Sequence, residues 1–181
     1  MATEKPQILH REALASTRLF HIERLALRFS NGTEVEYERL LSAGNGAVAV
    51  VPMLDDETVL LVREYAAGVD RYELGLPKGR IEPDEDPLKA ANRELKEEIG
   101  YGAHELRHLG ELTIAPAYLG HATHLILARD LYPQRLDGDE PEPLQVVPWR
   151  LDNIAELLAR NDCTEARSIA ALFMVRELMH G

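Results

Sequence analysis

The most regular pattern of hydrophobic and polar positions lies between residues 86 and 99. Apolar side chains recur there at spacings of three and four residues, at Leu88, Ala91, Leu95 and Ile99. This spacing places them on one face of an α-helix. Pro87 marks its start and Gly100 its end, as is usual at helix termini. The pattern therefore predicts a helix over residues 86–99.

Shorter apolar runs predict strands on both sides of this helix. Residues 47–52 and 58–63 are expected to be core strands around a polar turn, and residues 106–114 and 123–128 are expected to be strands after the helix. Residues 138–143 are acidic and interrupted by proline, which favours a loop. Helical apolar spacing predicts two further helices, over residues 151–160 and 165–179.

A β-hairpin is predicted over residues 19–41. Leu25, Leu27 and Phe29 alternate with Ala26 and Arg28, and Val35 and Tyr37 alternate with glutamates. This alternation predicts one buried and one hydrated face. Asn31-Gly32 favours a two-residue turn with positive φ at both central positions. We expect residues 1–43 to form a hairpin extension, used for dimerisation, and residues 44–181 to form the main domain.

Composition and charge narrow the function classes. The 181 residues are 45% hydrophobic, which suits one domain with an extension, and the single cysteine, Cys163, indicates a reducing compartment or a fold indifferent to redox. With no signal-peptide pattern and no apolar stretch of membrane-span length, we expect a cytoplasmic protein that does not bind a membrane. The net charge of −11, without a basic run, argues against a nucleic-acid partner.

Acidic residues on the helix over 86–99 are the candidate chemistry. Glu94 and Glu98 share a ridge beside the apolar face, and Glu97 lies further round the helix. Like charges four residues apart destabilise a helix by roughly a few tenths of a kcal/mol, and a divalent cation would remove this cost. Carboxylate oxygens suit Mg²⁺ or Mn²⁺, with phosphate oxygens as further ligands. The pair predicts a metal and phosphate site.

The loop before this helix, residues 75–83, adds polar groups. Its glycines allow the backbone to approach a ligand closely, and Lys78 and Arg80 could meet phosphate oxygens. Arg93 is four residues from Glu97 and within reach of Glu85, so we expect it to hold loop and helix together. Taken alone, residues 93–98 would better suit an ordinary solvated helical face than a metal site.

The spacing of residues from Gly79 to Tyr101 favours a metal site over a solvated helical face. It matches the Nudix box, Gly-x5-Glu-x7-Arg-Glu-apolar-x-Glu-Glu-x-Gly-apolar, with Tyr101 in the last place as a mild departure. The chain thus resembles the Nudix hydrolases. The resemblance implies an α/β/α sandwich with a mixed β-sheet, and an attack of water on a nucleoside diphosphate linked to another group.

Residues outside the box resemble one branch of that family. Stretches 60–65 and 72–79, after the N-terminal hairpin, are similar to ADP-ribose pyrophosphatases, and stretches 18–20, 29–32, 91–98, 130–133 and 138–144 are similar to hydrolases of ADP compounds. This implies Mg²⁺-dependent cleavage, with Mn²⁺ possible, of ADP-ribose, NADH or diadenosine polyphosphates such as Ap3A. The products would be AMP and a second phosphorylated compound, and the enzyme would be a homodimer.

The resemblance also implies roles for particular residues. Glu94, Glu97 and Glu98 would bind metal and act in catalysis with Arg93. A carboxylate of the acidic loop, Glu142 or then Glu140, would be the general base or an extra metal ligand; the alternative is a solvated charged loop.

Further positions are candidates for substrate binding. Arg63 and Tyr65 could meet a phosphate and an adenine, although strand-end packing would explain them as well. Pro116 and Tyr118 resemble residues of ADP-ribose and dinucleoside polyphosphate enzymes, with strand termination and packing beneath a loop as alternatives. Lys78 and Arg80 complete the set.

Other functions remain open at this point. A non-catalytic Nudix-fold nucleotide sensor would lack the metal carboxylates, and an RNA 5′-end pyrophosphohydrolase would need a basic track. Of the seven histidines, His121 and His124 are the closest pair. They would face opposite sides of a regular strand, so no histidine is assigned to a metal.

Overall fold

The computed structural model of the chain describes residues 4–41 and 44–180. The chain separates into two units. The first consists of Met1–Gly46 and Thr113–Ala122, and the second of Ala47–Leu112 and Thr123–Gly181. The glutamate-rich helix predicted above lies in the second unit.

Two sheets form the centre of the second unit. One has the strand order β7-β4-β9-β8, formed by Lys78–Arg80, Ala47–Pro52, Ala122–Pro133 and Tyr101–Thr113. Strand β4 runs parallel to β9 and antiparallel to β7, so this sheet is mixed. The other sheet is antiparallel and has the order β10-β5-β6, formed by Gln145–Arg150, Thr58–Ala66 and Arg71–Gly75.

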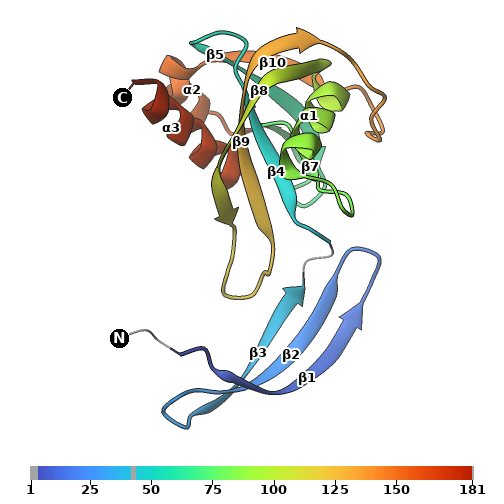
Figure 1. Cartoon of the computed structure of the whole chain (residues 1–181), viewed down its shortest axis with the longest axis vertical. Helices are drawn as coiled ribbons and strands as arrows, with labels where there is room; N and C mark the ends of the chain where they lie inside the picture. The colour runs from blue at the N-terminus through green and yellow to red at the C-terminus, as the bar shows by residue number, and fades with distance from the viewer. Residues whose placement is uncertain (1–3, 42–43, 181) are drawn as a thin grey trace. The chain divides into compact units, whose positions relative to one another are not determined.

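Helices cover these strands on two sides (Figure 1). Helix α1, Pro87–Glu98, lies on one side. The 3-10 helix η1, Leu151–Asn153, leads into α2, Ile154–Leu158, and the long α3, Ala166–His180, follows on the other side. The predicted α/β/α sandwich with a mixed sheet is confirmed.

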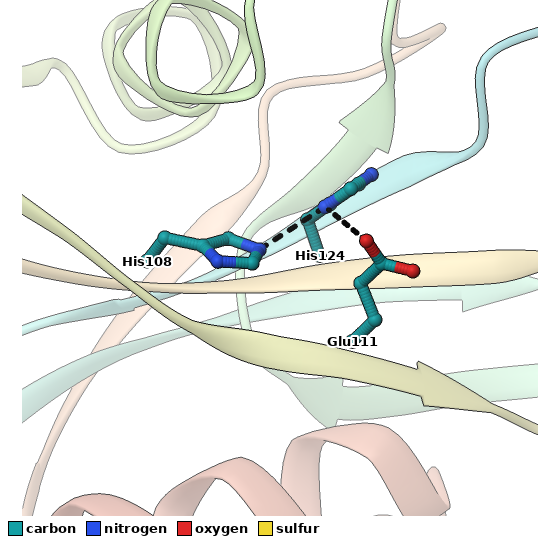
Figure 2. Close-up of side chains that lie close together, drawn as sticks. All are labelled: His108, Glu111 and His124. Atoms are coloured by element: carbon teal, nitrogen blue, oxygen red, sulfur yellow. Dashed lines mark hydrogen bonds and ion pairs between the residues drawn. The ribbon is translucent and has the colours of Figure 1, made fainter.

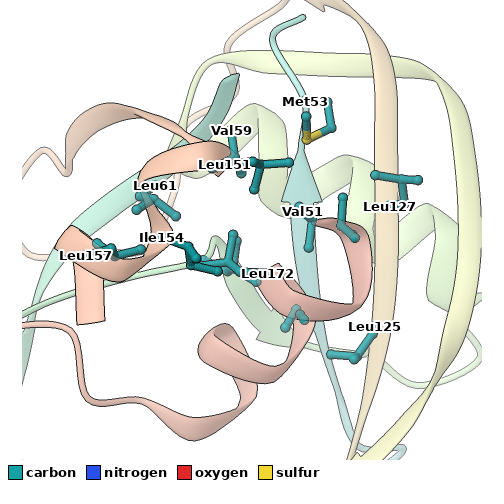
Figure 3. Packing of buried hydrophobic residues seen from close by; sticks show 14 of the residues in the cluster. Val51, Met53, Val59, Leu61, Leu125, Leu127, Leu151, Ile154, Leu157 and Leu172 are labelled. Atoms are coloured by element: carbon teal, nitrogen blue, oxygen red, sulfur yellow. The ribbon is translucent and has the colours of Figure 1, made fainter. Parts of the chain in front are cut away.

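The central strands are buried on both faces, which explains their continuous apolar runs. Alternate residues of β4, β5 and β9 belong to two different hydrophobic clusters. Figure 3 shows the cluster that includes side chains of α2 and α3, to which the strands contribute Ala49, Val51, Val59, Leu61, Leu125 and Leu127. The cluster beside α1 receives Val48, Val50, Leu60, Val62, Ile126 and Ala128. This double burial fixes α1 against the sheet.

Several elements of the second unit were not predicted from the sequence. Strands β6 and β7 are short, and β10 contains Pro148, which tends to exclude a strand assignment. Pro148 is accommodated because β10 lies at the edge of its sheet, where a missing N–H donor is tolerated. The helix predicted over 151–160 is shorter, since it begins as a 3-10 turn and α2 ends at Leu158.

The first unit contains a three-stranded antiparallel sheet rather than a hairpin alone. Strands β1 (Gln7–Ser16), β2 (His21–Arg28) and β3 (Glu34–Leu41) pair in that order, and β1 was not predicted. Within this unit, Leu40 donates its backbone N–H to the carbonyl oxygen of Tyr118 at 2.8 Å. The segment 113–122 therefore belongs with this sheet.

Two details of the predicted hairpin were wrong. The turn is not a two-residue turn with positive φ at both central positions. Of Asn31 and Gly32, only Gly32 has positive φ, at 86°, and Phe29 donates to the carbonyl of Thr33, which closes a longer loop. The expected buried face is also incomplete, because Val35 and Tyr37 are exposed.

Leu172 of α3 offers a test of the packing between helix and sheet. It is 1% exposed, so replacing it with alanine leaves a cavity, and we expect Leu172→Ala to lower the free energy of unfolding by about 2–5 kcal/mol in urea titrations. Met174→Ala, on the same helix at a 36% exposed position, is the control and should change stability by less than about 1 kcal/mol. Equal losses in both variants would contradict this packing.

Candidate active site

Helix α1 begins and is oriented through local signals. Asp86 is its N-cap and accepts a hydrogen bond from the Leu88 backbone N–H at 2.9 Å, and Pro87 occupies the first turn. The apolar face buries Ala90, Ala91 and Leu95. With this face against the sheet, two carboxylates lie at the edge of the buried surface of the helix. Glu94 is 7% exposed and Glu98 is 3% exposed.

Arg93 connects the preceding loop to this helix. Its guanidinium group donates to both carboxylate oxygens of Glu85, each at 3.0 Å, and to the backbone carbonyl of Arg80 at 2.9 Å. It also donates to Glu94 at 2.7 Å and to Glu97 at 3.0 Å. The expected contact between Arg93 and Glu85 is present, and Arg93 lowers the pKa of Glu85 through these hydrogen bonds.

The backbone of strand β7 lies directly against the buried carboxylates. A Cβ atom at Gly79 would lie 2.0 Å from the carboxyl carbon and Oε1 of Glu94, so only glycine leaves room there. The Lys78 backbone N–H donates to both oxygens of Glu98 at 3.3 Å. The backbone of this loop, which was expected to approach a ligand closely, lies close to Glu94 and Glu98 of the helix.

Burial controls the charge of these two glutamates. It raises the pKa of Glu98 to about 9, although the positive charge of Lys78 opposes this shift. It also raises the pKa of Glu94, while the hydrogen bond from Arg93 acts in the opposite direction. Burial therefore makes negative charge costly in a site that carries several carboxylates.

The residues present fit a divalent metal ion. Glu94 and Glu98 offer hard carboxylate oxygens, Glu97 lies on the next part of the helix surface, and the missing side chain of Gly79 lets the Glu94 carboxylate lie directly against the backbone of β7. A cation held there would offset the cost of burying these charges. Glu94, Glu97 and Glu98 are accordingly the residues that could hold the metal.

The acidic loop lies beside this helix. A Cβ at Gly138 would be 3.5 Å from the Cβ of Glu97, and Glu140 is close enough for its charge to contribute to the raised pKa of Glu94. Residues of this loop line a surface pocket together with Glu97. Glu142 lines the same pocket and accepts a hydrogen bond from the Tyr72 hydroxyl at 2.6 Å. Both Glu140 and Glu142 therefore share a pocket with Glu97, and the charge of Glu140 also acts on Glu94.

The candidate substrate residues of β5 and β7 already have partners. Arg63 forms an ion pair with Asp162 at 2.6 Å, and Lys78 forms one with Glu64 at 2.8 Å. The Tyr65 hydroxyl donates to Asp70 at 2.5 Å. Substrate contacts by these side chains would have to replace or extend these interactions.

The remaining substrate candidates differ in their settings. The Arg80 side chain is exposed, and only its backbone carbonyl contacts Arg93. Pro116 and Tyr118 belong to the first unit, where Tyr118 is 56% exposed. Substrate-binding roles for these three residues stay predictions.

Comparison with known proteins identifies the family and supports the fold. The NUDIX domain family matches residues 45–173, which include the whole site described above. The chain belongs to the Nudix family. Residues 6–39 match the NudE-type Nudix hydrolase N-terminal domain, which corresponds to most of the three-stranded sheet. The resemblance drawn from the box is confirmed, and the protein is a Nudix hydrolase, a class of metal-dependent enzymes.

Individual relatives extend this similarity over the chain. The ADP compounds hydrolase NudE of Escherichia coli K12 is 48% identical over 178 residues, covering 98% of this chain and 95% of that protein. The ADP-ribose pyrophosphatase of Bacillus subtilis 168 is 28% identical over 129 residues, which is 70% of each chain. A crystal structure of an ADP compounds hydrolase, 48% identical, superposes with a TM-score of 0.92 over 100% of this chain and 97% of its own.

One polar cluster outside the box was missed by sequence reasoning. His124 lies beside His108 of β8, and Glu111 completes the group. The only available signal was Gly110, because an isolated glycine in a strand can mark a change of face.

No helix in the described part of the chain is long and apolar enough to cross a membrane.

Gly79 gives a direct test of the site. We expect Gly79→Ala to displace the Glu94 carboxylate and lower the turnover rate by roughly 100-fold, since small misplacements of reacting groups have effects of this size. Steady-state kinetics would measure the loss. Gly68→Ala is the control, because no heavy atom lies within 4 Å of its added Cβ. Unchanged turnover in Gly79→Ala would contradict the described approach.

Proposed function

We propose that this protein is a Mg²⁺-dependent pyrophosphohydrolase that cleaves the diphosphate of ADP-linked compounds, releasing AMP and a second phosphorylated product. The substrate candidates are ADP-ribose, NADH and diadenosine polyphosphates such as Ap3A. The observation that carries the proposal is the buried pair of carboxylates on α1, with Glu94 against the backbone of Gly79 and Glu98 against that of Lys78. The ADP-compound substrates are supported by a relative with that name, which is 48% identical over 98% of this chain.

The side chains of the box have different roles, in binding the metal or in positioning its ligands. Glu94 and Glu98 hold the metal, and Glu97 assists as a ligand or through water. When bound, Mg²⁺ or Mn²⁺ neutralises phosphate charge and makes water a better nucleophile. Arg93 positions Glu94 and Glu97 by donating to both, while Glu85 holds the other edge of its guanidinium group.

Residues outside the box would bind the substrate. Lys78 and Arg63 are cationic groups on strands that adjoin the site, and each is held in place by an acidic partner. Tyr65 stacks edge-on against Tyr72, with ring centroids 5.6 Å apart. An aromatic pair of this kind suits the flat face of an adenine. We assign phosphate contacts to Arg63, Lys78 and Arg80 and adenine contacts to Tyr65, with Pro116 and Tyr118 as further candidates.

A substrate panel tests the proposal. The full-length protein is incubated with ADP-ribose, NADH and Ap3A, each with Mg²⁺ or Mn²⁺, and the products are identified by chromatography. AMP from at least one compound is the expected result. Binding of a nucleotide without turnover would favour a sensor, and release of pyrophosphate from 5′-triphosphate RNA alone would favour an RNA 5′-end enzyme.

Removing one carboxylate charge tests the metal assignment. Glu98→Gln keeps the size of the side chain but removes a ligand charge, so we expect turnover to fall by at least about 1000-fold in saturating Mg²⁺ with the circular dichroism spectrum unchanged. Glu105→Gln, at an exposed position of β8, is the matched control. Substantial activity in Glu98→Gln would refute the role of this residue.

The acidic loop provides a second test. We propose that one of its carboxylates, Glu142 or Glu140, acts as general base, and removing that base should lower kcat by about 100-fold to 10000-fold. The two Gln variants are compared separately. Because Glu140 is linked electrostatically to Glu94 and Glu142 is bonded to Tyr72, a loss confined to one variant identifies the base. Near-normal kcat in both would remove the loop from catalysis.

We further propose that the protein is a homodimer formed through its first unit. Its sheet leaves large apolar side chains exposed, including Ile8, Leu14, Phe20, Val35 and Tyr37. A small sheet with open edges and exposed apolar residues is suited to pairing with a second copy. A monomeric mass by light scattering would contradict this. A cytoplasmic location and the lack of a nucleic-acid partner stay predictions.

A further inference from the structure

Two histidines and a glutamate meet on strands β8 and β9 of the second unit (Figure 2). His108 Nε2 lies 3.1 Å from His124 Nδ1, and the same His124 nitrogen lies 3.4 Å from Glu111 Oε1. The three potential ligand atoms are all within 4.8 Å of one another. Among the described residues, this is the one group of three such side chains with that spacing.

An irregularity in β8 creates this arrangement. In a regular strand, residues three apart point to opposite faces, so His108 and Glu111 would be separated. Gly110 has a φ of 151°, a conformation that favours glycine, and it interrupts the alternation. Leu109 and Leu112 both pack against the core cluster as a result. His108 and Glu111 are then both exposed, beside His124 of the neighbouring strand.

The spacing of the ligand atoms matches a small metal ion. Nitrogen and oxygen ligands about 2.0–2.2 Å from Zn²⁺ in a tetrahedral arrangement lie roughly 3.3–3.5 Å from one another. Two of the three separations, 3.1 Å and 3.4 Å, are close to this value, and the third, between His108 and Glu111, is at most 4.8 Å. Only small side-chain movements would bring the three atoms into a common coordination sphere.

We propose that His108, Glu111 and His124 form a binding site for a transition-metal ion of the Zn²⁺ class. Two imidazole nitrogens and one carboxylate oxygen suit Zn²⁺, Co²⁺ or Ni²⁺, whereas Mg²⁺ prefers ligand sets made of oxygen. The site therefore differs in metal preference from the carboxylate set of α1. With only three protein ligands, of which His108 and Glu111 are exposed, the ion keeps positions for water.

A bound ion would link β8 to β9 through its ligands on both strands. Glu111 lies two residues before the end of β8 and His124 two residues after the start of β9, and the chain between these strands carries Pro116 and Tyr118. Since an ion bound only by the folded protein stabilises it, the melting temperature should rise with Zn²⁺ concentration. This consequence does not depend on the proposed hydrolase activity.

Calorimetric titration of the full-length protein with Zn²⁺ tests the site. Saturating Mg²⁺ and a Glu98→Gln background suppress binding at α1, so that one Zn²⁺ per chain is expected to remain. His108→Ala and His124→Ala should each weaken Zn²⁺ affinity by at least about tenfold, because loss even of groups that support a metal ligand has effects of this size. Each should also lose the rise in melting temperature.

His104→Ala is the matched control for these variants. His104 lies on the same strand and is exposed, but its ring stacks on Tyr132 at a centroid distance of 4.4 Å, away from the cluster. Its variant should bind Zn²⁺ as the parent does. Glu111→Gln, at an exposed position, serves if a histidine variant fails to fold.

Nuclear magnetic resonance of the histidine rings separates this site from adventitious binding. Zn²⁺ should shift the ring signals of His108 and His124 and leave those of His104 unchanged. Equal Zn²⁺ affinity in the parent, His108→Ala and His124→Ala proteins would overturn the proposal. So would the lack of any Zn²⁺ binding to the Glu98→Gln protein.

Discussion

The guanidinium group of Arg93 holds the active-site loop and helix α1 in one arrangement. It donates to Glu85 from two nitrogens and also reaches the Arg80 carbonyl, Glu94 and Glu97. A guanidinium group can do this because its five donors lie in one rigid plane. The positions of three carboxylates and one backbone carbonyl therefore depend on a single side chain, and a lysine could not replace it.

The charge balance of the box explains its need for a metal. Glu85, Glu94 and Glu97 all pair with Arg93, whose single positive charge cannot neutralise all three, and the buried Glu98 lies against Lys78. Burial adds to the imbalance, because it raises the pKa of Glu94 and of Glu98. The absence of a side chain at Gly79 lets the Glu94 carboxylate lie against the backbone of β7. Negative charge and burial together would favour the binding of a cation at these carboxylates.

The sandwich gives the two proposed metal sites different chemistry. Helix α1 is packed on the sheet through one face, so its site is built from carboxylates at the buried boundary. The cluster of His108, Glu111 and His124 lies on strands, where Gly110 turns two polar side chains outward. Oxygen ligands in the first and mixed nitrogen and oxygen ligands in the second favour different ions.

Local signals were enough to predict much of the second unit. Apolar periodicity and the Pro87 and Gly100 boundaries gave helix α1 nearly to its ends, and the apolar run at 47–52 gave β4 with its observed bounds. The ridge of Glu94 and Glu98 followed from helical geometry alone. These features could be predicted because each depends on residues a few positions apart in the chain.

Only the tertiary structure decided the contacts between distant residues. The pairs Arg63 with Asp162, Tyr72 with Glu142 and His108 with His124 depend on which strands and loops become neighbours. Strands β1, β6, β7 and β10 were missed because pairing with neighbouring strands, not a strong local pattern, holds them in place. The sequence by itself determined the Nudix box and its helix, because the spacing of residues along a helix fixes the direction in which each side chain points. Pairing between strands, and the change of face at Gly110, determined the rest.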